Sequence, residues 1–184
     1  MKKGSLIPYV LRLSLTLLVI TAVVAAALAG VNAITEPLIR AHQEAKTQAA
    51  MEAVLPGAQD LREVAFEDAT GIVSAVYASD AGYVVETAPS GFGGTISMMV
   101  GIHPDGTVSG ISIVSHSETA GLGSVAAAKT SAGEAFRGQF AGLSGTLAVD
   151  KDGGGIDAIT SATITSRAVT AGVNAALECV RNLG

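Results

Sequence analysis

The sequence predicts an α+β domain that follows one N-terminal transmembrane helix, and three observations support this. Residues 13–33 contain no charged side chain, and at about 1.5 Å per helical residue they span roughly 30 Å, the thickness of a bilayer core. From residue 61 onward, short β-branched runs alternate with glycine and aspartate turns, which is typical of strands. From residue 163 onward, apolar side chains recur at helical spacing. Strands combined with helices in this way indicate an α+β domain.

Composition and charge support a membrane anchor with an external domain. The chain is 49% hydrophobic with a mean hydropathy of +0.49, which is too apolar for an ordinary soluble domain. Lys2, Lys3 and Arg12 precede the apolar run, whereas 8 basic and 16 acidic residues follow it, a net charge of −8. Short segments rich in Lys and Arg stay in the cytoplasm. We therefore expect a cytoplasmic N-terminus and an extracytoplasmic domain in the cell (inner) membrane.

Four segments are expected along the chain. They are a cytoplasmic N-terminus (1–12), a transmembrane helix (13–33), a connecting helix or linker (34–60) and an extracytoplasmic domain (61–184). The connecting helix should begin at Thr35-Glu36-Pro37, because proline is favoured in the first helical turn. A cleaved signal peptide is the alternative for the apolar run, since Val31-Asn32-Ala33 resembles a cleavage site. The run is longer than the usual ~7 to 15 apolar residues of a signal peptide, which favours a retained anchor.

The strands and helices of the domain can be placed by their patterns. Strands are expected at residues 63–66, 72–78, 83–87, 95–102, 107–114 and 145–149. The pair 95–102 and 107–114 should form a hairpin around an Asp-Gly turn, in the middle of the sheet. Residues 125–139 predict one or two short helices, residues 150–155 a polar glycine turn, and Thr163 opens a C-terminal amphipathic helix.

Five hydroxyl side chains stand around the start of this last helix. They are Thr160, Ser161, Thr163, Thr165 and Ser166. The free N–H groups and the dipole at a helix N-terminus favour a bound phosphate. Ser and Thr are also preferred as helix caps, so the residues alone leave a phosphate site and an ordinary cap both open.

The run Asp157-Ala158-Ile159-Thr160-Ser161-Ala162-Thr163 resembles the flavinylation motif Asp-x-x-Ser/Thr-Gly-Ala-Thr of FMN-binding domains in bacterial ion-pumping redox complexes. The resemblance implies that a flavin transferase moves FMN from FAD to Thr163, forming a phosphoester, and that Asp157 helps this transferase to dock or holds its metal. Further contacts to the cofactor are expected from Thr160, Ser161, Ala162 and Thr165. Ser161 stands where glycine is usual, which costs about 1 kcal/mol if the backbone needs a positive φ.

Two more stretches resemble the same family. Residues 91–94 resemble its Gly-aromatic-Gly-Gly segment, and residues 115–123 resemble its Ser-His-x-Glu-Thr-Pro-Gly-Leu-Gly loop, with Ala120 in place of proline. The resemblance implies flavin contacts from Glu118, Thr119, Gly121, Leu122 and Gly123. Leu122 would pack on the ring, and the glycines would admit backbone N–H groups to its polar atoms. Without the family, this stretch could be an ordinary connection.

With its N-terminal anchor, the chain is most similar to G subunits of Rnf-type ion-translocating ferredoxin:NAD oxidoreductase complexes. The C subunits of Na-translocating NADH:quinone reductases are the next most similar. The resemblance implies a flavoprotein that transfers electrons and is, through its phosphoester, also a phosphoprotein. Its partners would be the other membrane subunits of a translocase and, during maturation, the flavin transferase.

Several other functions are disfavoured by the sequence. An acidic domain argues against nucleic-acid binding, and the single Cys179 excludes an internal disulfide and a cysteine-based iron–sulfur or zinc site. No nicotinamide fingerprint, nucleophile triad or metal-binding cluster is visible. We therefore expect no catalytic residue and no metal site in the chain alone. A non-redox anchored module, such as a pilin-like subunit, is the alternative from another class of function, although the basic leader of pilins is missing. A third possibility, a flavin-binding sensor, would need further membrane helices or cysteine motifs.

Overall fold

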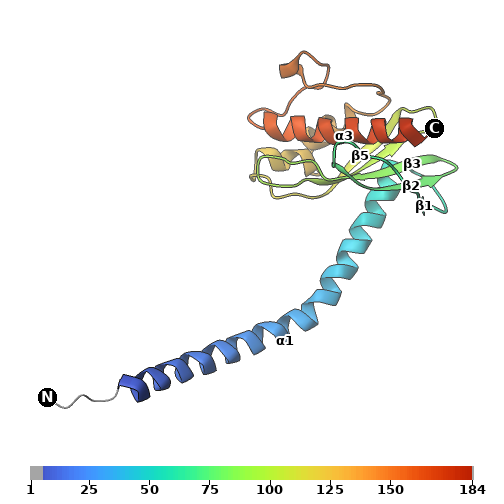
Figure 1. The fold of residues 1–184 in the computed structure, drawn as a ribbon. Coiled ribbons are helices and arrows are strands. Elements are labelled where there is room, and N and C mark those ends of the chain that lie inside the picture. Colours follow the sequence, from blue (N-terminus) through green and yellow to red (C-terminus); the bar gives the residue numbers. More distant parts are fainter. Residues whose placement is uncertain (1–5, 184) are drawn as a thin grey trace. The chain divides into compact units, whose positions relative to one another are not determined.

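The computed structural model describes residues 6–183, and the chain divides into two compact units, residues 1–45 and 46–184 (Figure 1). Helix α1 (Leu6–Val54) accounts for the described part of the first unit, and its last residues belong to the second. The second unit contains the sheet and the remaining helices. This architecture confirms the predicted class, an α+β domain that follows an apolar N-terminal helix.

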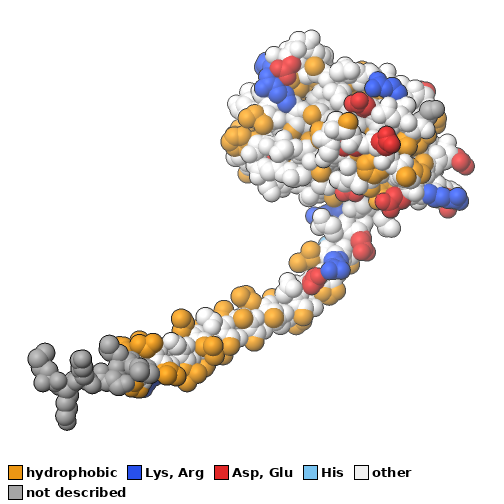
Figure 2. Space-filling model, in the orientation of Figure 1, with side chains coloured by type: hydrophobic (Ala, Val, Ile, Leu, Met, Phe, Trp, Pro, Cys, Tyr) orange, Lys and Arg blue, Asp and Glu red, His pale blue; other side chains and the backbone are white. Residues whose placement is uncertain are grey.

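Helix α1 is long and apolar enough, between Pro8 and Val54, to be a candidate membrane span. Its side chains are exposed from residue 8 to residue 46, and hydrophobic side chains cover much of its length (Figure 2). The hydroxyls of Thr16 and Thr21 donate to carbonyl oxygens one turn earlier, at 2.8 and 3.0 Å. These hydroxyls therefore need no water. An apolar surface of this extent is more stable in lipid or against other apolar helices than in water.

The prediction that a separate helix begins at Thr35-Glu36-Pro37 is wrong, because α1 continues through Pro37. Proline lacks an N–H group and so removes one hydrogen bond from a helix interior. Other contacts support the helix at this point. The Thr35 hydroxyl donates to the Val31 carbonyl at 3.0 Å, and Arg40 pairs with Glu36 one turn away.

The second unit is built on a five-stranded antiparallel sheet with the order β1-β2-β3-β4-β5. Its strands are β1 (Arg62–Glu63), β2 (Val73–Ser79), β3 (Gly82–Thr87), β4 (Ser97–Ile102) and β5 (Val108–Ser115). Each strand pairs with the next strand along the chain, so the β4–β5 hairpin lies at one edge. The expectation that this hairpin forms the middle of the sheet is wrong, because every connection in the sheet joins neighbouring strands.

Different helices cover the two faces of this sheet. Side chains alternate between faces along a strand, and Val85 packs in the cluster that contains helix α3 (Thr163–Leu183), whereas Val84 packs against the end of α1. Figure 1 shows α3 lying along the sheet. Gly101 permits the close approach of α1, since a Cβ atom there would lie 2.0 Å from the Val54 carbonyl oxygen. The sheet is therefore buried on both faces.

Three short helices connect β5 to α3. They are η1 (Gly123–Ala127), α2 (Ser131–Gly138) and η2 (Asp150–Asp152). The strand predicted at residues 145–149 is wrong, because this stretch makes only a single bridge, between Val149 and Ile156. The side-chain amide of Asn174 bonds both the N–H and the carbonyl of Leu147, each at 2.8 Å. A side chain from α3 thus takes the place of a partner strand.

Candidate functional site

A pocket of about 360 Å³ opens at the N-terminal end of α3. It is lined by Phe92, Glu118, Thr119, Leu122, Gly123, Ser161, Ala162, Thr163, Ile164 and Thr165. Three segments that are distant in the sequence therefore meet here: the glycine loop 91–94, the loop 115–123 and the first turn of α3. The volume lies within the roughly 300 to 1,000 Å³ that is usual for small-molecule sites.

The carboxylate of Glu118 joins these three segments. Glu118 is buried, with 8% of its surface exposed. One of its oxygens accepts a hydrogen bond from the Gly93 N–H at 2.9 Å, and the other accepts one from the Thr165 hydroxyl at 2.5 Å. Gly123 packs against the same carboxylate so closely that a Cβ atom would lie 2.4 Å from Oε2. The walls of the pocket are therefore held together by one buried side chain.

The hydroxyls around the start of α3 fall into two groups. Thr165 and Ser166 are buried at 2% and 0% exposure. The Ser166 hydroxyl donates to the Ala162 carbonyl and accepts from the Ile159 N–H, both at 3.0 Å, while Thr165 is bonded to Glu118. The side chains of Thr160, Ser161 and Thr163 make no hydrogen bond within residues 6–183. Of these, Ser161 and Thr163 line the pocket.

Backbone amides at the start of α3 add positive potential to the pocket. The first intrahelical bond runs from the Ser166 N–H to the Ala162 carbonyl at 3.0 Å, so the amides of Thr163, Ile164 and Thr165 precede it and have no partner in the helix. These amides and the helix dipole favour an anion. No basic side chain lines the pocket, so the helix end is the group there that is suited to stabilise an anion such as a phosphate.

Ser161, which stands where the motif usually has glycine, has a left-handed backbone conformation with φ of 61°. The Ala162 N–H closes the turn onto the Ile159 carbonyl at 2.9 Å, and the chain then enters the helix. A non-glycine residue pays about 1 kcal/mol for this conformation. The turn is therefore strained beside the pocket.

Ion pairs support the segment that leads into this turn. Arg167 donates two hydrogen bonds to the Asp152 carboxylate, at 2.8 and 2.6 Å, and this pairing lowers the pKa of Asp152. The pKa of Asp150 is also lowered, first by its hydrogen bond with Lys151 and then by the Ala158 N–H, which donates to it at 3.1 Å. Both carboxylates are solvent-exposed, so these pairs restrict the conformation of the loop but contribute little to the stability of the fold.

The pocket brings together most of the residues that the resemblance implicated. Thr160 and Gly121 instead line an adjacent groove of about 520 Å³, which also contains Asp157. The Gly121 N–H is used by the Ser124 hydroxyl at 2.9 Å, and Asp157 is exposed. The Thr165 hydroxyl donates to Glu118.

Sequence reasoning gave no role to two residues of the pocket, Phe92 and Ile164. Outside α1, the exposed large hydrophobic side chains in the described part of the chain are Phe92, Leu122 and Ile164, with 69%, 41% and 50% of their surface exposed. All three line this pocket. The sequence signal is an aromatic residue between glycines and an isoleucine between two threonines. Apolar groups gathered at one opening indicate a site that an apolar ligand covers.

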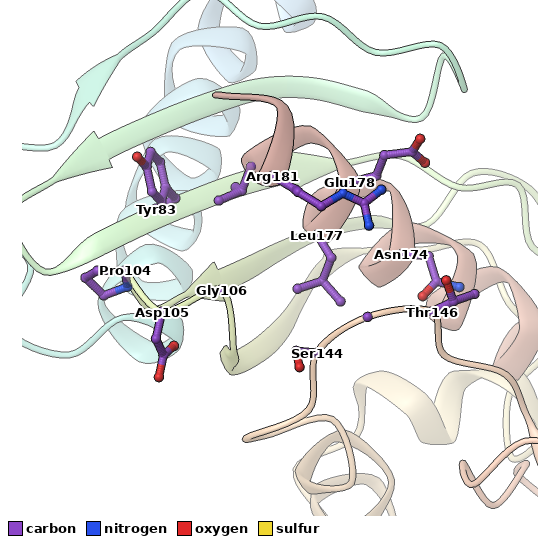
Figure 3. A pocket seen from close by; sticks show the side chains of 12 residues that line it. Tyr83, Pro104, Asp105, Gly106, Ser144, Thr146, Asn174, Leu177, Glu178 and Arg181 are labelled. Atoms are coloured by element: carbon purple, nitrogen blue, oxygen red, sulfur yellow. The ribbon is translucent and has the colours of Figure 1, made fainter. Parts of the chain in front are cut away.

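A second pocket, of about 460 Å³, lies near the other end of α3 (Figure 3). Tyr83, Asp105 and Leu177 are among its lining residues. The Asp105 carboxylate already accepts hydrogen bonds from the N–H and hydroxyl of Thr107, at 2.9 and 2.6 Å. None of the implicated residues lines this pocket, so the pocket beside Thr163 is the candidate site.

Comparison with known proteins agrees with this choice. Residues 91–178 match the FMN-binding domain family, and residues 1–54 match the RnfG N-terminal region. The chain is 35% identical to the G subunit of the Na⁺-translocating ferredoxin:NAD⁺ oxidoreductase complex of Acetobacterium woodii, over 95% of this chain and 93% of the relative. It is 33% identical to the G subunit of the ion-translocating oxidoreductase complex of Methanosarcina acetivorans, over 92% and 93% of the two chains. A relative from the proton-translocating complex of Clostridium ljungdahlii is 47% identical over about half of each chain.

Proposed function

Because the chain belongs to the family of G subunits of Rnf-type ion-translocating oxidoreductase complexes and contains an FMN-binding domain, we propose that it carries FMN as a phosphoester of Thr163. In this proposal the chain is anchored in the membrane by α1. It relays electrons between the other membrane subunits of its complex.

The chemistry of the pocket supports FMN, which has an apolar ring at one end and a phosphate at the other. The ring would cover Phe92, Leu122 and Ile164, whose exposure to water is otherwise unfavourable. The phosphate would lie at the free amides of the first α3 turn. Thr163 stands between these two features and has a hydroxyl without a hydrogen bond in the described residues. The clustering of the exposed apolar side chains around this hydroxyl is the observation that carries the proposal.

Attachment would transfer the FMN part of FAD to the Thr163 hydroxyl. The Thr163 oxygen attacks the FMN phosphorus of FAD, and an ester bond forms while the pyrophosphate bond breaks. AMP leaves, and the hydroxyl proton passes to a base of the transferase or to water. Asp157, exposed and six residues upstream, is available for the transferase or its metal ion.

The residues of the pocket would then hold the cofactor in a fixed orientation. When bound, FMN supplies reversible one- and two-electron redox chemistry. Glu118 maintains the spacing between the glycine loop and α3 through its two hydrogen bonds. Phe92, Leu122 and Ile164 would shield part of the ring from water, while the open side of the pocket would let a redox partner approach. The covalent bond prevents loss of the cofactor from a compartment outside the cytoplasm.

The charge distribution supports the orientation of the anchor. Lys2, Lys3 and Arg12 precede the apolar run, and the net charge of the rest is negative, so the N-terminus should be cytoplasmic and residues 61–184 extracytoplasmic. A reporter fused after Gly184 is expected to be active only as an extracytoplasmic enzyme. Cytoplasmic reporter activity would contradict the orientation.

Expression with and without a flavin transferase tests the proposed function directly. With the transferase, the purified full chain should be yellow, should stay fluorescent on a denaturing gel and should gain the mass of one FMN less one water. Without the transferase it should be colourless. A colourless chain of unmodified mass in both cases would leave only an anchored module without redox function.

A further inference from the structure

One side chain outside the motif holds the backbone of the motif's first residue. The Asp157 N–H donates to Gln139 Oε1 at 2.7 Å, and Gln139 Nε2 donates to the Asp157 carbonyl at 3.2 Å. A single carboxamide thus bonds both the N–H and the carbonyl of one residue, as a neighbouring strand would. Neither bond uses the Asp157 carboxylate, which is exposed and makes no hydrogen bond within residues 6–183.

The backbone on both sides of Gln139 is held by the core, while the Gln139 side chain is half-buried. It directly follows α2 and stands between Phe136 and Phe140, which are 3% and 0% exposed. The two rings pack edge to face, with centroids 5.6 Å apart. Arg137 of the same helix donates to the carbonyls of Ala126 and Ala128, at 2.6 and 3.1 Å. The carboxamide therefore extends from a rigid support.

The rest of the segment is held residue by residue. The Ile156 N–H donates to the Ala148 carbonyl at 3.2 Å, the Ala158 N–H to Asp150 at 3.1 Å, and the Ile159 N–H to the Ser166 hydroxyl at 3.0 Å. With the Gln139 contact, four consecutive amides have partners. In contrast, the Asp157 carboxylate and the hydroxyls of Thr160, Ser161 and Thr163 make no hydrogen bond within residues 6–183.

We propose that Gln139 is a positioning residue for flavin transfer, which fixes the backbone of Asp157 relative to Thr163 and so restricts the positions that the Asp157 carboxylate can occupy. This inference rests on the proposed function and names a residue through which the transferase recognises its acceptor. Asp157 and Gln139 line one groove, and Thr163 lines the adjoining pocket. A segment already ordered in this way spares the transferase the entropy of ordering it during docking.

Two substitutions separate hydrogen bonding from packing. Gln139→Ala removes the whole carboxamide, whereas Gln139→Met keeps a side chain of similar size without the two hydrogen bonds. With purified transferase and FAD, both full-length variants should be flavinylated about tenfold more slowly than the wild type, which is within the roughly 100-fold that a misplacement of about 1 Å can cost. Gln59→Ala changes an exposed glutamine outside the groove and the pocket, and should react at the wild-type rate.

A second readout needs no flavin. Amide hydrogen exchange at Asp157 should be faster in both Gln139 variants than in the wild type, while circular dichroism shows that the fold is retained. If the exchange rate at Asp157 is unchanged, Gln139 does not order the motif and the inference is wrong.

A double-mutant cycle tests whether Gln139 acts through Asp157. In an Asp157→Asn background, or in Asp157→Ser if the first is inert, Gln139→Ala should reduce the rate by less than twofold. Three results would each overturn this inference while leaving the proposed function intact. They are an equal, roughly tenfold loss in both backgrounds, an unchanged rate in the Gln139 variants, and a faster rate in these variants. A wild-type chain that takes up no flavin would overturn the proposed function and this inference with it.

Discussion

The first turn of α3 has two sides that differ in what their threonines can do. Thr165 is 2% exposed and its hydroxyl donates to the buried carboxylate of Glu118 at 2.5 Å. Thr163, two residues earlier, lines the pocket beside the exposed Ile164, and its hydroxyl makes no hydrogen bond in the described part of the chain. One turn of helix therefore contains one hydroxyl that is used in a buried contact and another that has no hydrogen-bond partner within residues 6–183. Burial and partners separate the two residues, although their side chains are identical.

The largest expected effect is on cofactor attachment. Thr163→Ala removes the ester oxygen and should abolish the fluorescent band on a denaturing gel, whereas Thr163→Ser keeps a hydroxyl and should retain the band. Thr165→Ala should retain it as well, because the acceptor hydroxyl is unchanged. If Thr165→Ala alone loses the flavin while Thr163→Ala keeps it, the two sides of the turn have been assigned the wrong way round.

The effect on stability should be larger for Thr165→Ala than for Thr163→Ala, the opposite of the effect on flavin attachment. Thr165→Ala leaves a buried carboxylate oxygen without its donor, which should lower the free energy of unfolding by about 1 to 3 kcal/mol. Thr163→Ala removes a hydroxyl that has no partner and should stay within about 0.5 kcal/mol of the wild type. Urea unfolding of the flavin-free protein measures both values. Equal losses would mean that the Glu118 contact contributes nothing particular to the turn.

The smallest effect concerns the strained turn before the helix. Ser161→Gly relieves the positive φ of 61° and should raise the free energy of unfolding by up to about 1 kcal/mol. Flavinylation should be at least as fast as in the wild type. Asp60→Gly is a matched control, because Asp60 also has a positive φ, of 53°, outside the pocket. It should gain similar stability without a change in flavinylation rate, and a faster rate in this control would rule out a local effect at Ser161.

Much of the fold was predictable because its patterns are local. The strands β2 to β5 begin and end within two residues of the predicted ranges, since alternation and turn residues mark their limits. Two of the errors have different causes, one a contact between distant residues and the other a local exception. The chain near Leu147 is bonded by Asn174 instead of a strand, and α1 passes through Pro37 where a local rule predicts a new start.

The candidate site was only partly predictable for the same reason. The resemblance of residues 157–163 indicated Thr163, and the glycine usual at position 161 pointed to the place where the structure has a positive φ. The difference between Thr163 and Thr165 depends on Glu118, 47 residues away from Thr165, and no local pattern reveals it. Phe92 and Ile164 became noticeable only once their exposure beside the same pocket was known.

The most direct test of the account is to locate the flavin on the chain. Trypsin cleaves after Lys151 and Arg167, so one peptide, residues 152–167, contains all five hydroxyls. Fragmentation of this peptide from flavinylated protein should place a mass of one FMN less one water on Thr163. The same mass on Thr160, Ser161, Thr165 or Ser166, or an unmodified peptide from yellow protein, would contradict the assignment.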